Sequence, residues 1–307
     1  MNLYSERLIR SLDRWVQFVL LTLLSMVITL PAHAAATQPS RLPTEELVPG
    51  GIAIIPIPAA KPSQGEQSAE PVVHFRDNRV LIVQAIGSTQ WLAIIGIPRS
   101  TRAGKYPIAI QWPSSKTIQH FVVADKRYAE QRIQIENKRQ VNPEKRDMIR
   151  IINESQIMKK AFTSWTTEVG RSLRMNWPVS GPISSPFGLT RFFNDQPRRP
   201  HSGIDIAAPT GTPITAPKAG TVIATGDFFF NGNTVILDHG KGLISLFCHL
   251  DRIDTKNGEI LSRGTQLGTV GQTGRATGPH LHWSLNLNNV RINPMLFLDG
   301  NSSLNSE

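Results

Sequence analysis

The sequence contains a single cysteine, Cys248, in 307 residues. An intrachain disulfide, a cysteine-based zinc finger and a CxxC redox site are therefore excluded, and a metal site has to be built from histidines and carboxylates. Aromatic residues make up only 7% of the chain and charged residues 18%, whereas 40% of the residues are hydrophobic. This ordinary globular composition leaves room for about two domains and fits neither wholesale disorder nor a multi-span membrane protein.

Long apolar runs are scarce outside the N-terminus. Arg7, Arg10 and Arg14 lead into an apolar run over residues 15–30, and Ala-His-Ala at 32–34 supplies an A-x-A cleavage site. This pattern is typical of a secretory signal peptide, which we predict at residues 1–34. An uncleaved segment would instead anchor the chain in the inner membrane, because the run approaches the ~20 residues that span a bilayer. In both cases the rest of the chain is exported.

Acidic residues are outnumbered along the chain. The sequence has 33 Lys and Arg against 23 Asp and Glu, a formal net charge of +10. Much of the excess lies in residues 126–174, which carry twelve basic and six acidic residues. For an exported protein we expect an anionic envelope surface as partner, such as cell-wall polymer or lipid headgroups, and no nucleic acid. A merely solvated basic helix explains any single one of these charges equally well.

The pattern in the first half of the chain predicts β-strands, which follow a polar linker at residues 35–49. Seven short β-branched stretches are separated by turn residues, and they predict an immunoglobulin-like β-sandwich domain over residues 50–137 that lacks the usual cysteine pair. His74 and His120 each occur singly in these stretches, so we expect structural or exposed side chains there. The predicted strands cover residues 52–57, 71–75, 79–86, 91–97, 106–111, 117–124 and 131–136.

A helical linker is predicted over residues 138–175. Asn142 is a good N-cap, Pro143 suits the first helical position, and apolar residues recur at spacings of three and four as far as Gly170. These features indicate an amphipathic helix of about seven turns that packs on the domains it joins. A membrane-binding helix is the less favoured alternative, because Glu154 and Glu168 interrupt its basic face.

The last part of the chain is rich in glycine and proline with short alternating strands. It predicts a compact antiparallel β domain over residues 176–300 and a frayed tail at 301–307. The fold class is therefore mainly β, with an N-terminal sandwich, one linking helix and a C-terminal β domain.

Histidines are concentrated in this C-terminal domain. On a strand the side chains alternate, so His280 and His282 of GPHLHWSLNL should project from one face. Upstream, HSGID offers the imidazole of His201 and the carboxylate of Asp205, and the small residues between them allow the loop to fold back. Five of the eight histidines lie in the last 107 residues: His201, His239, His249, His280 and His282.

This set of side chains suits a metal ion. Zinc takes four N and O ligands, and a catalytic site keeps one position for water. His201, Asp205 and His282 supply three ligands for one zinc ion per chain. His249 and His280 then remain free to transfer protons and to stabilise charge beside it. HxxxD and HxH motifs each occur by chance, but together, in Gly- and Pro-rich turns of a basic exported chain, they predict a metal site.

The same segments resemble the LytM/lysostaphin-type zinc metallopeptidases, which cleave peptide bonds in peptidoglycan. The resemblance rests on SSPFGLTRFFN, RRPHSGIDIAAPTGTPITAPKAGTV, LFCHLDRI and GQTGRATGPHLHW and covers about residues 176–298. It implies an antiparallel β domain with a narrow groove, the duplicated hybrid motif. It also implies that His201, Asp205 and His282 bind zinc, and that His249 and His280 take the positions of the family's two catalytic histidines.

The N-terminal part is more loosely similar to the β domain that precedes the peptidase in a Gram-negative subgroup of this family. This similarity implies a periplasmic murein endopeptidase that cuts cross-links of the D-Ala to meso-diaminopimelate type. The alternative is a non-catalytic regulator that binds and activates a murein amidase, although degenerate regulators lose ligands or catalytic histidines. The sequence has no HExxH helix, so a histidine has to act as the base, and either His249 or His280 can fill that role.

Other candidates are expected to be structural. His239 lies at a Gly-flanked turn. Cys248 precedes His249 on a strand, so its side chain is expected to face the other way and to be buried in the core. The aromatic residues 228–230 and Trp283 are expected to pack in the core. Asn194 stands where some relatives carry a zinc-blocking residue, and it is assigned no role.

Overall fold

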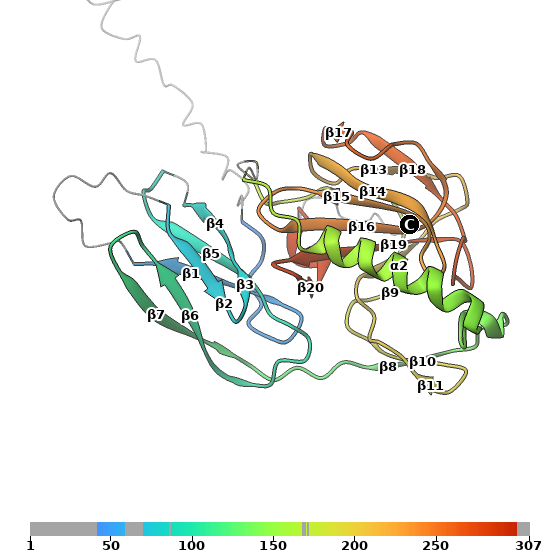
Figure 1. Ribbon diagram of the computed structural model, residues 1–307, viewed down its shortest axis with the longest axis horizontal. Helices are drawn as coiled ribbons and strands as arrows, with labels where there is room; N and C mark the ends of the chain where they lie inside the picture. Colours follow the sequence, from blue (N-terminus) through green and yellow to red (C-terminus); the bar gives the residue numbers. More distant parts are fainter. Residues whose placement is uncertain (1–41, 59–69, 86, 168–169, 171, 300–307) are drawn as a thin grey trace, which may run out of the picture. The chain divides into compact units, whose positions relative to one another are not determined.

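The computed structural model describes residues 42–58, 70–85, 87–167, 170 and 172–299. The predicted signal peptide, the first part of the linker and the tail lie outside the described residues. The described residues belong to one compact unit, in which strands predominate (Figure 1). Among them, no helix is both long enough and apolar enough to cross a membrane.

The N-terminal half is a β-sandwich, as predicted. One antiparallel sheet has the strand order β1-β5-β4 and the other has the order β3-β2-β6-β7. Their facing sides bury apolar residues such as Ile95 from the first sheet and Ile108, Ile110 and Phe121 from the second. The strands are β1 (Ile52–Ile57), β2 (Val72–Phe75), β3 (Asn78–Arg79), β4 (Leu81–Gln84), β5 (Trp91–Gly96), β6 (Gly104–Gln111) and β7 (Lys116–Val123).

The sandwich shares apolar contacts with the C-terminal domain through β5. This strand is buried on both faces, which accounts for its unbroken apolar run. Ala93 and Ile95 face the sandwich core, whereas Leu92 and Ile94 join the core of the C-terminal domain. At Gly96 a Cβ atom would lie 2.8 Å from the carbonyl oxygen of Leu287, so only glycine permits this approach.

The last strand predicted for the sandwich belongs elsewhere. Residues 131–136 contribute to β8 (Glu130–Ile133), which pairs in parallel with β10 (Thr190–Phe193) of the C-terminal domain. Seven strands of the sandwich still lie among the residues that the structure describes, because the stretch predicted as one strand at 79–86 is divided between β3 and β4. Local periodicity indicates that a segment is extended, but it does not tell which sheet the segment joins.

The linking helix is shorter than predicted. Helix α2 (Lys145–Phe162) has 18 residues, and its N-cap is Glu144 rather than Asn142. Glu144 and Asp147 form a capping box, in which each side chain accepts a hydrogen bond from the other residue's backbone N–H. This reciprocal cap satisfies the first turn, so the helix begins there.

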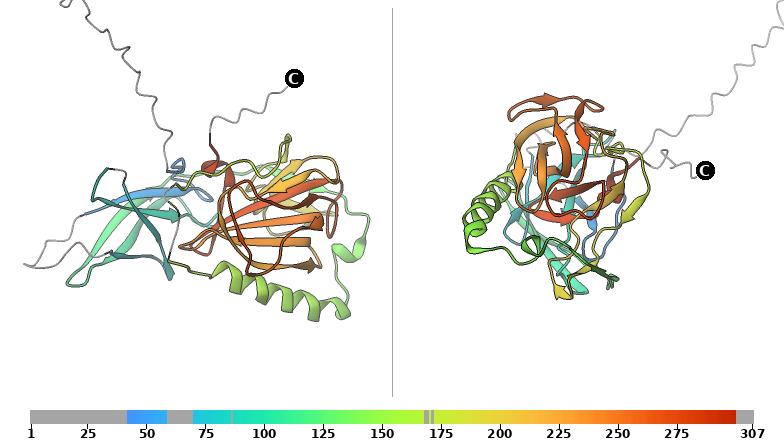
Figure 2. Two further views of the ribbon diagram at one scale, coloured as in Figure 1. Left: turned by 90° about the horizontal axis from the view of Figure 1, so that it is seen from above. Right: turned by 90° about the vertical axis from the view of Figure 1, so that its right-hand side faces the viewer.

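The helix ends well before Gly170. The Ser164 hydroxyl donates to Oδ2 of Asp238 at 2.9 Å, which draws the chain away from the helix axis. On its inner side α2 packs along β14 (Gly220–Phe228), as Figure 2 shows. Ala161 is buried on that side, and Met158 and Phe162 are partly buried. The predicted packing of one apolar face is thus present, on the C-terminal domain.

The C-terminal domain is built on a large, mostly antiparallel sheet with the order β17-β14-β15-β16-β19-β12-β9, to which β13, β18 and β20 add. Its core includes Phe247, Trp283 and Phe297, so Trp283 packs inside as expected. Phe228 and Phe229 are also buried. The elements are η1 (Lys138–Gln140), β9 (Ile183–Ser185), β11 (Gln196–Pro197), β12 (Ile204–Ala207), β13 (Pro213–Thr215), β14 (Gly220–Phe228), β15 (Gly232–Asp238), β16 (Leu243–Ile253), β17 (Ile260–Leu261), β18 (Gln266–Val270), β19 (His280–Leu287), β20 (Val290–Ile292) and η2 (Pro294–Phe297).

Candidate metal centre and active site

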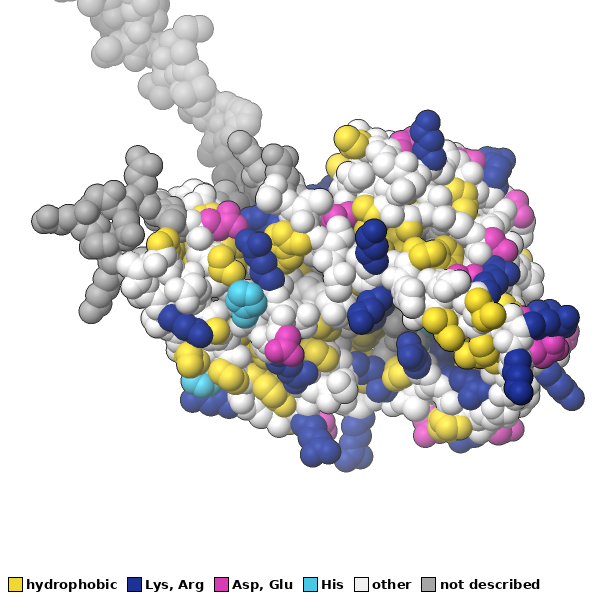
Figure 3. Space-filling view, viewed as in Figure 1, with side chains coloured by type: hydrophobic (Ala, Val, Ile, Leu, Met, Phe, Trp, Pro, Cys, Tyr) yellow, Lys and Arg dark blue, Asp and Glu magenta, His cyan; other side chains and the backbone are white. Residues whose placement is uncertain are grey.

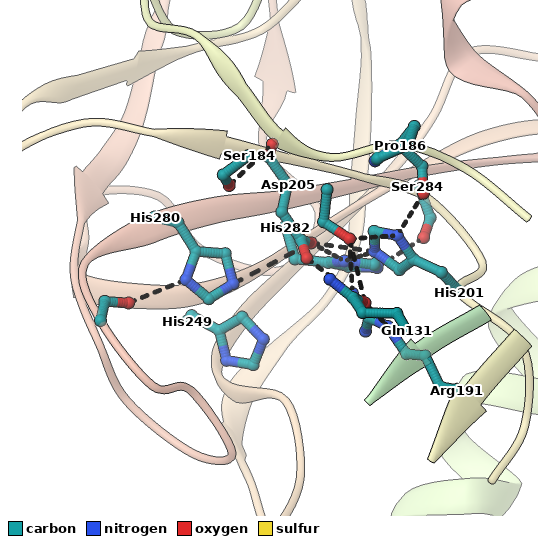
Figure 4. Close-up of polar contacts among 12 residues, drawn as sticks. Gln131, Ser184, Pro186, Arg191, His201, Asp205, His249, His280, His282 and Ser284 are labelled. Atoms are coloured by element: carbon teal, nitrogen blue, oxygen red, sulfur yellow. Dashed lines mark hydrogen bonds and ion pairs between the residues drawn. The ribbon is translucent and has the colours of Figure 1, made fainter. Parts of the chain in front are cut away.

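Two neighbouring strands bring a histidine and a carboxylate together. His280 and His282 open β19 and project from one face of it, as the alternation predicts (Figure 4). Strand β12 runs antiparallel to β19, and Asp205 lies directly opposite His282 in the register. Directly opposed residues share one face of a sheet, so the Asp205 carboxylate meets the His282 ring.

His201 reaches the same place from the loop before β12. Its backbone N–H donates to the carbonyl oxygen of Leu189 at 2.9 Å, and its own carbonyl accepts from Gly188 N–H at 2.9 Å. The chain then passes close to β19 at Gly203, where a Cβ atom would lie 2.3 Å from the carbonyl oxygen of Trp283. Glycine is therefore required for His201 and Asp205 to point toward one position.

Replacing Gly203 with alanine is expected to push the His201 loop off β19 and to destabilise the fold by about 2–4 kcal/mol. Urea unfolding of the zinc-free protein measures this loss. Gly278→Ala is the matched control, because a Cβ atom there meets nothing within 4 Å. An equal effect of the two substitutions would show that the close approach at Gly203 is not what limits that position.

Three buried ligand atoms converge. Nε2 of His201 lies 2.9 Å from Oδ1 of Asp205 and 3.0 Å from Nδ1 of His282. Nδ1 of His282 lies 2.7 Å from the same Asp205 oxygen. All three residues are buried, and they form the group that can hold a metal ion among the described residues. Two imidazoles and one carboxylate are a donor set that suits zinc.

The hydrogen bonds on the far side of each ring show which nitrogens face the centre. Nδ1–H of His201 donates to the carbonyl oxygen of Pro186 at 2.7 Å, which leaves Nε2 as an acceptor. Nε2 of His282 lies 2.8 Å from the hydroxyl of Ser284, and when Nε2–H donates to that hydroxyl, Nδ1 is the inward acceptor. With the carboxylate oxygen of Asp205, three lone pairs then face one point, and a cation at that point relieves their repulsion. The residues present therefore fit a zinc ion.

His249 and His280 lie beside this centre. Their ring centroids are 4.9 Å apart, and the His249 ring lies 6.1 Å from that of His282. Nδ1–H of His249 donates to the carbonyl oxygen of Thr273, and that of His280 donates to the carbonyl oxygen of Gly278, both at 2.8 Å. These bonds leave Nε2 of each ring free, and Nε2 of His280 lies 3.9 Å from the Asp205 carboxylate.

His249 owes its position to a break in strand β16. The register with β15 shifts between Asn233 and Val235, and His249 has a φ of 66°, in the left-handed region. Two residues of β16, Cys248 and His249, thus lie opposite one residue of β15, Thr234, and this arrangement is a β-bulge. Cys248 pairs with His282 and shares its face of the sheet, so the expected strict alternation between Cys248 and His249 is wrong. Cys248 is nevertheless buried, as predicted, and burial raises the pKa of its thiol to about 12.

The titration behaviour of the centre follows from burial. Burial lowers the pKa of His282 to about 4. Burial, with help from the neighbouring His280 and His282, lowers the pKa of His249 to about 3. Burial alone would raise the pKa of Asp205, but the contacts with His201 and His282 outweigh it and hold that pKa well below its usual range. A neutral ring at His282 and an ionised carboxylate at Asp205 are the protonation states that metal binding requires.

Sequence reasoning missed one residue of the centre, Arg191 on β10. Its Nη2 donates to Oδ2 of Asp205 at 2.8 Å and to the Ser185 hydroxyl at 3.0 Å. Its Nε donates to Oε1 of Gln131 at 3.0 Å, and Gln131 lies on β8. Arg191 therefore occupies the carboxylate oxygen of Asp205 that faces away from the centre. In the sequence it lies in SSPFGLTRFFN, one of the segments that carry the family resemblance, but nothing in that segment by itself indicates this contact.

The N-terminal domain holds the loop that orients His201. Arg99 donates through Nε to the carbonyl oxygen of Gly188 at 2.7 Å and through Nη2 to the hydroxyl of Thr190 at 2.8 Å. Tyr128 packs edge-on against Phe187, and burial raises the pKa of its phenol to about 12. The ordered loop in turn places the Pro186 carbonyl against the His201 ring.

A cleft of about 480 Å³ lies near the centre, where α2 begins. Gly274 lines it and follows Thr273, the residue whose carbonyl group holds His249. Its lining also includes charged residues of both signs: Arg139, Arg146, Asp147, Arg150 and Asp227.

The other candidates have structural positions. The side chain of Asn194 forms two hydrogen bonds with the backbone of Ile135. It accepts from the N–H of that residue at 2.7 Å and donates to its carbonyl oxygen at 3.0 Å. His74 and His120 are exposed on the outer face of the sandwich. His239 is buried, and its ring bonds the carbonyl oxygen of Ala219 and the hydroxyl of Ser245.

His239 is expected to make the fold sensitive to acid. Burial lowers its pKa from 6.5 to about 4, so its stabilising effect is complete above pH 6.5 and is lost as the pH falls toward 4. The full loss is about 3 kcal/mol. His239→Asn keeps a donor toward Ala219 but cannot titrate. Urea unfolding should therefore show the variant less stable than the parent at pH 8, with the difference shrinking at pH 5. A constant difference would contradict the assignment.

The chain matches two family descriptions, "Peptidase family M23" over residues 199–294 and "Peptidase family M23 N-terminal domain" over residues 45–126. Peptidoglycan DD-endopeptidase ShyC of Vibrio cholerae is 43% identical over 142 residues, which cover 45% of this chain and 29% of that protein. ShyA of the same organism is 37% identical over 123 residues, covering 37% and 28%. This chain therefore matches less than a third of the length of these curated relatives.

A crystal structure from Pseudomonas aeruginosa, assigned to peptidase M23, aligns with a TM-score of 0.67 at 39% sequence identity. The alignment covers 83% of this chain and 95% of that chain, so it includes both the sandwich and the domain with the histidine cluster. From these matches, and from the centre that His201, Asp205 and His282 form, we conclude that the chain belongs to peptidase family M23.

Proposed function

We propose that this protein is a zinc-dependent murein endopeptidase that hydrolyses peptide cross-links in the cell wall. The observation that carries the proposal is the convergence of His201, Asp205 and His282 on one point, with the free Nε2 atoms of His249 and His280 beside it. The names of the relatives, peptidoglycan DD-endopeptidases, support peptidoglycan as the substrate. The sequence resemblance supports the D-Ala to meso-diaminopimelate bond, and the leader-like N-terminus supports the periplasm.

The proposed chemistry needs one zinc ion, held by Nε2 of His201, Nδ1 of His282 and Oδ1 of Asp205. Zinc bound there supplies a Lewis acid that polarises the scissile carbonyl group and makes water acidic enough to attack at neutral pH. The protein's own part is to keep the three ligands deprotonated and fixed, through Pro186, Ser284 and Arg191.

His249 and His280 are the groups that move protons in this proposal. Both rings are held by Nδ1–H donation to a backbone carbonyl, so both offer Nε2 to the reacting atoms. One ring takes a proton from the attacking water and passes it to the leaving amine, and the other, when it is protonated on Nε2, donates to the carbonyl oxygen and stabilises the charge that develops there. Because the two rings are held by the same kind of hydrogen bond, the geometry does not distinguish the two roles, and kinetic measurements on single variants are needed to assign them.

The alternative function, a non-catalytic activator of a murein amidase, is less well supported. Such a regulator has no need for an assembled set of ligands and proton-transfer groups. Here all five side chains are present and grouped, and Arg191 supports the carboxylate as well.

The test is to incubate residues 35–307 with intact diaminopimelate-type murein and to resolve the products by mass spectrometry. Cross-linked dimers should be converted to monomers, a chelator should block the conversion, and added Zn²⁺ should restore it. The mass of the products identifies the bond. A zinc-loaded protein that leaves the dimers intact would contradict the proposal and would favour the regulator.

A further inference from the structure

Helix α2 exposes apolar side chains on the side that faces solvent. Ile149 is 70% exposed, Ile152 50% and Met148 42%. These residues lie one, three and four positions apart on the helix, so they form one contiguous patch. Isolated exposed apolar residues are ordinary on soluble proteins, but a contiguous patch on one helix marks an interaction surface.

Basic residues surround this patch. Lys145 lies at one end of the helix, and Lys159 and Lys160 lie at the other, all three exposed. We define the outward face of α2 as the six residues Lys145, Met148, Ile149, Ile152, Lys159 and Lys160. Figure 3 shows hydrophobic and basic side chains side by side in this region of the surface.

The acidic residues of α2 are turned away from the outward face. Asp147 is buried and paired with Arg139. Glu154 accepts from the N–H of Phe229 at 2.8 Å and from Arg150 at 2.5 Å. The sequence pattern predicted that Glu154 and Glu168 interrupt a basic face. The position of Glu154 contradicts that prediction, and Glu168 lies outside the described residues. The outward face thus carries positive charge without a compensating carboxylate of the helix itself.

We propose that the outward face of α2 docks the protein on an anionic phospholipid bilayer. The lysines are attracted to lipid phosphates, which is worth about fivefold in binding for each residue near the surface. The apolar patch requires an apolar phase to enter, and lipid acyl chains supply one. Cell-wall polymer is also anionic, but its sugars and peptides offer no such phase, so the combination of side chains favours lipid.

The test is cosedimentation of residues 35–307, which contain the compact unit and lack the apolar N-terminal run, with vesicles of stated composition. We expect binding to vesicles of phosphatidylcholine with phosphatidylglycerol to be at least about tenfold stronger than to phosphatidylcholine alone, and to weaken as salt is raised. The double variant Ile149→Gln, Ile152→Gln should bind about tenfold more weakly. Lys159→Gln with Lys160→Gln should bind about 25-fold more weakly at low salt.

Matched control variants lie on the sandwich. Ile118 and Val122 of β7 are 64% and 60% exposed, and Lys105 and Lys116 are exposed lysines of β6 and β7. Ile118→Gln with Val122→Gln removes a similar apolar area, and Lys105→Gln with Lys116→Gln removes the same charge. Both double variants should leave vesicle binding unchanged. None of these substitutions touches the metal centre, so all variants should hydrolyse a soluble substrate at the parent rate.

Three results would overturn the proposal. The first is no binding to anionic vesicles, which would leave the face to a protein partner. The second is equal loss of vesicle binding in the β7 controls, which would indicate nonspecific adsorption. The third is a variant with Ile149 and Ile152 replaced that loses binding to purified murein sacculi but keeps its binding to vesicles. That result would assign the outward face of α2 to wall polymer.

Discussion

Alanine in place of His249 or His280 is expected to lower kcat/KM on cross-linked murein by about 10²–10⁴-fold while zinc stays bound. Neither ring is among the three converging ligand atoms, so its removal leaves the donor set intact. What is lost is a free Nε2 atom beside the reacting carbonyl group. Measuring kcat/KM together with zinc content separates this effect from loss of the metal.

The double variant sharpens this expectation. If both rings serve one sequence of proton transfer and charge stabilisation, removing the second ring costs much less than removing the first. His120→Ala is the control, because this histidine is exposed on the sandwich and should leave the rate unchanged. Folded, zinc-loaded variants of His249 and His280 that hydrolyse murein at the parent rate would place the base elsewhere.

Part of the centre can be predicted from local pattern. The side-chain period of a strand places His280 and His282 on one face, whatever the rest of the fold does. The small residues after His201 indicate a close passage of the chain, and the contact of Gly203 with β19 is its physical cause. Such features need only a few consecutive residues, so a sequence displays them.

The position of His249 depends on more than local pattern. Strict alternation on β16 would send Cys248 and His249 to opposite faces, yet a bulge with a left-handed residue brings His249 beside His280. A non-glycine residue with positive φ is intrinsically unfavourable, and it persists here because the surrounding contacts hold it. In the sequence, the clustering of histidines and the family resemblance indicated this residue, but no local pattern placed it beside His280.

The membership of β8 and the outward face of α2 could not be predicted for a related reason. An extended segment with alternating residues pairs with whichever edge the tertiary fold presents, and β8 finds β10 across a separation of about 60 residues in sequence. On α2 the apolar residues are spread around much of the helix, so periodicity alone could not tell which of them face β14 and which face solvent.

Removing Arg191 is expected to weaken zinc binding by about 10–100-fold, the usual effect of losing a residue that orients a metal ligand. Arg191 is the donor to the outer oxygen of Asp205, so Arg191→Leu leaves that buried oxygen unpaired and lets the carboxylate turn. Competition with a chelating dye gives the zinc affinity directly, without relying on turnover.

Two further variants decide how Arg191 acts. Arg191→Lys keeps the charge but cannot reach Asp205, Ser185 and Gln131 together, so it should recover only part of the affinity. Gln131→Ala removes the contact from β8 and should cost about threefold to tenfold, because Arg191 then keeps only its bonds to Asp205 and Ser185. Arg132→Leu is the control, since this neighbour on β8 pairs with Asp195 and is more than half exposed.

If Arg191→Leu lowers the stability of the zinc-free protein but leaves the zinc affinity at the parent value, then Arg191 stabilises the packing of β10 and does not orient the metal ligand Asp205. If the affinity falls in Gln131→Ala and not in Arg132→Leu, the β8 segment contributes to the metal centre through one chain of hydrogen bonds. The segment that connects the sandwich to the C-terminal domain would then take part in building that centre, because the donor that fixes Asp205 is itself held from β8.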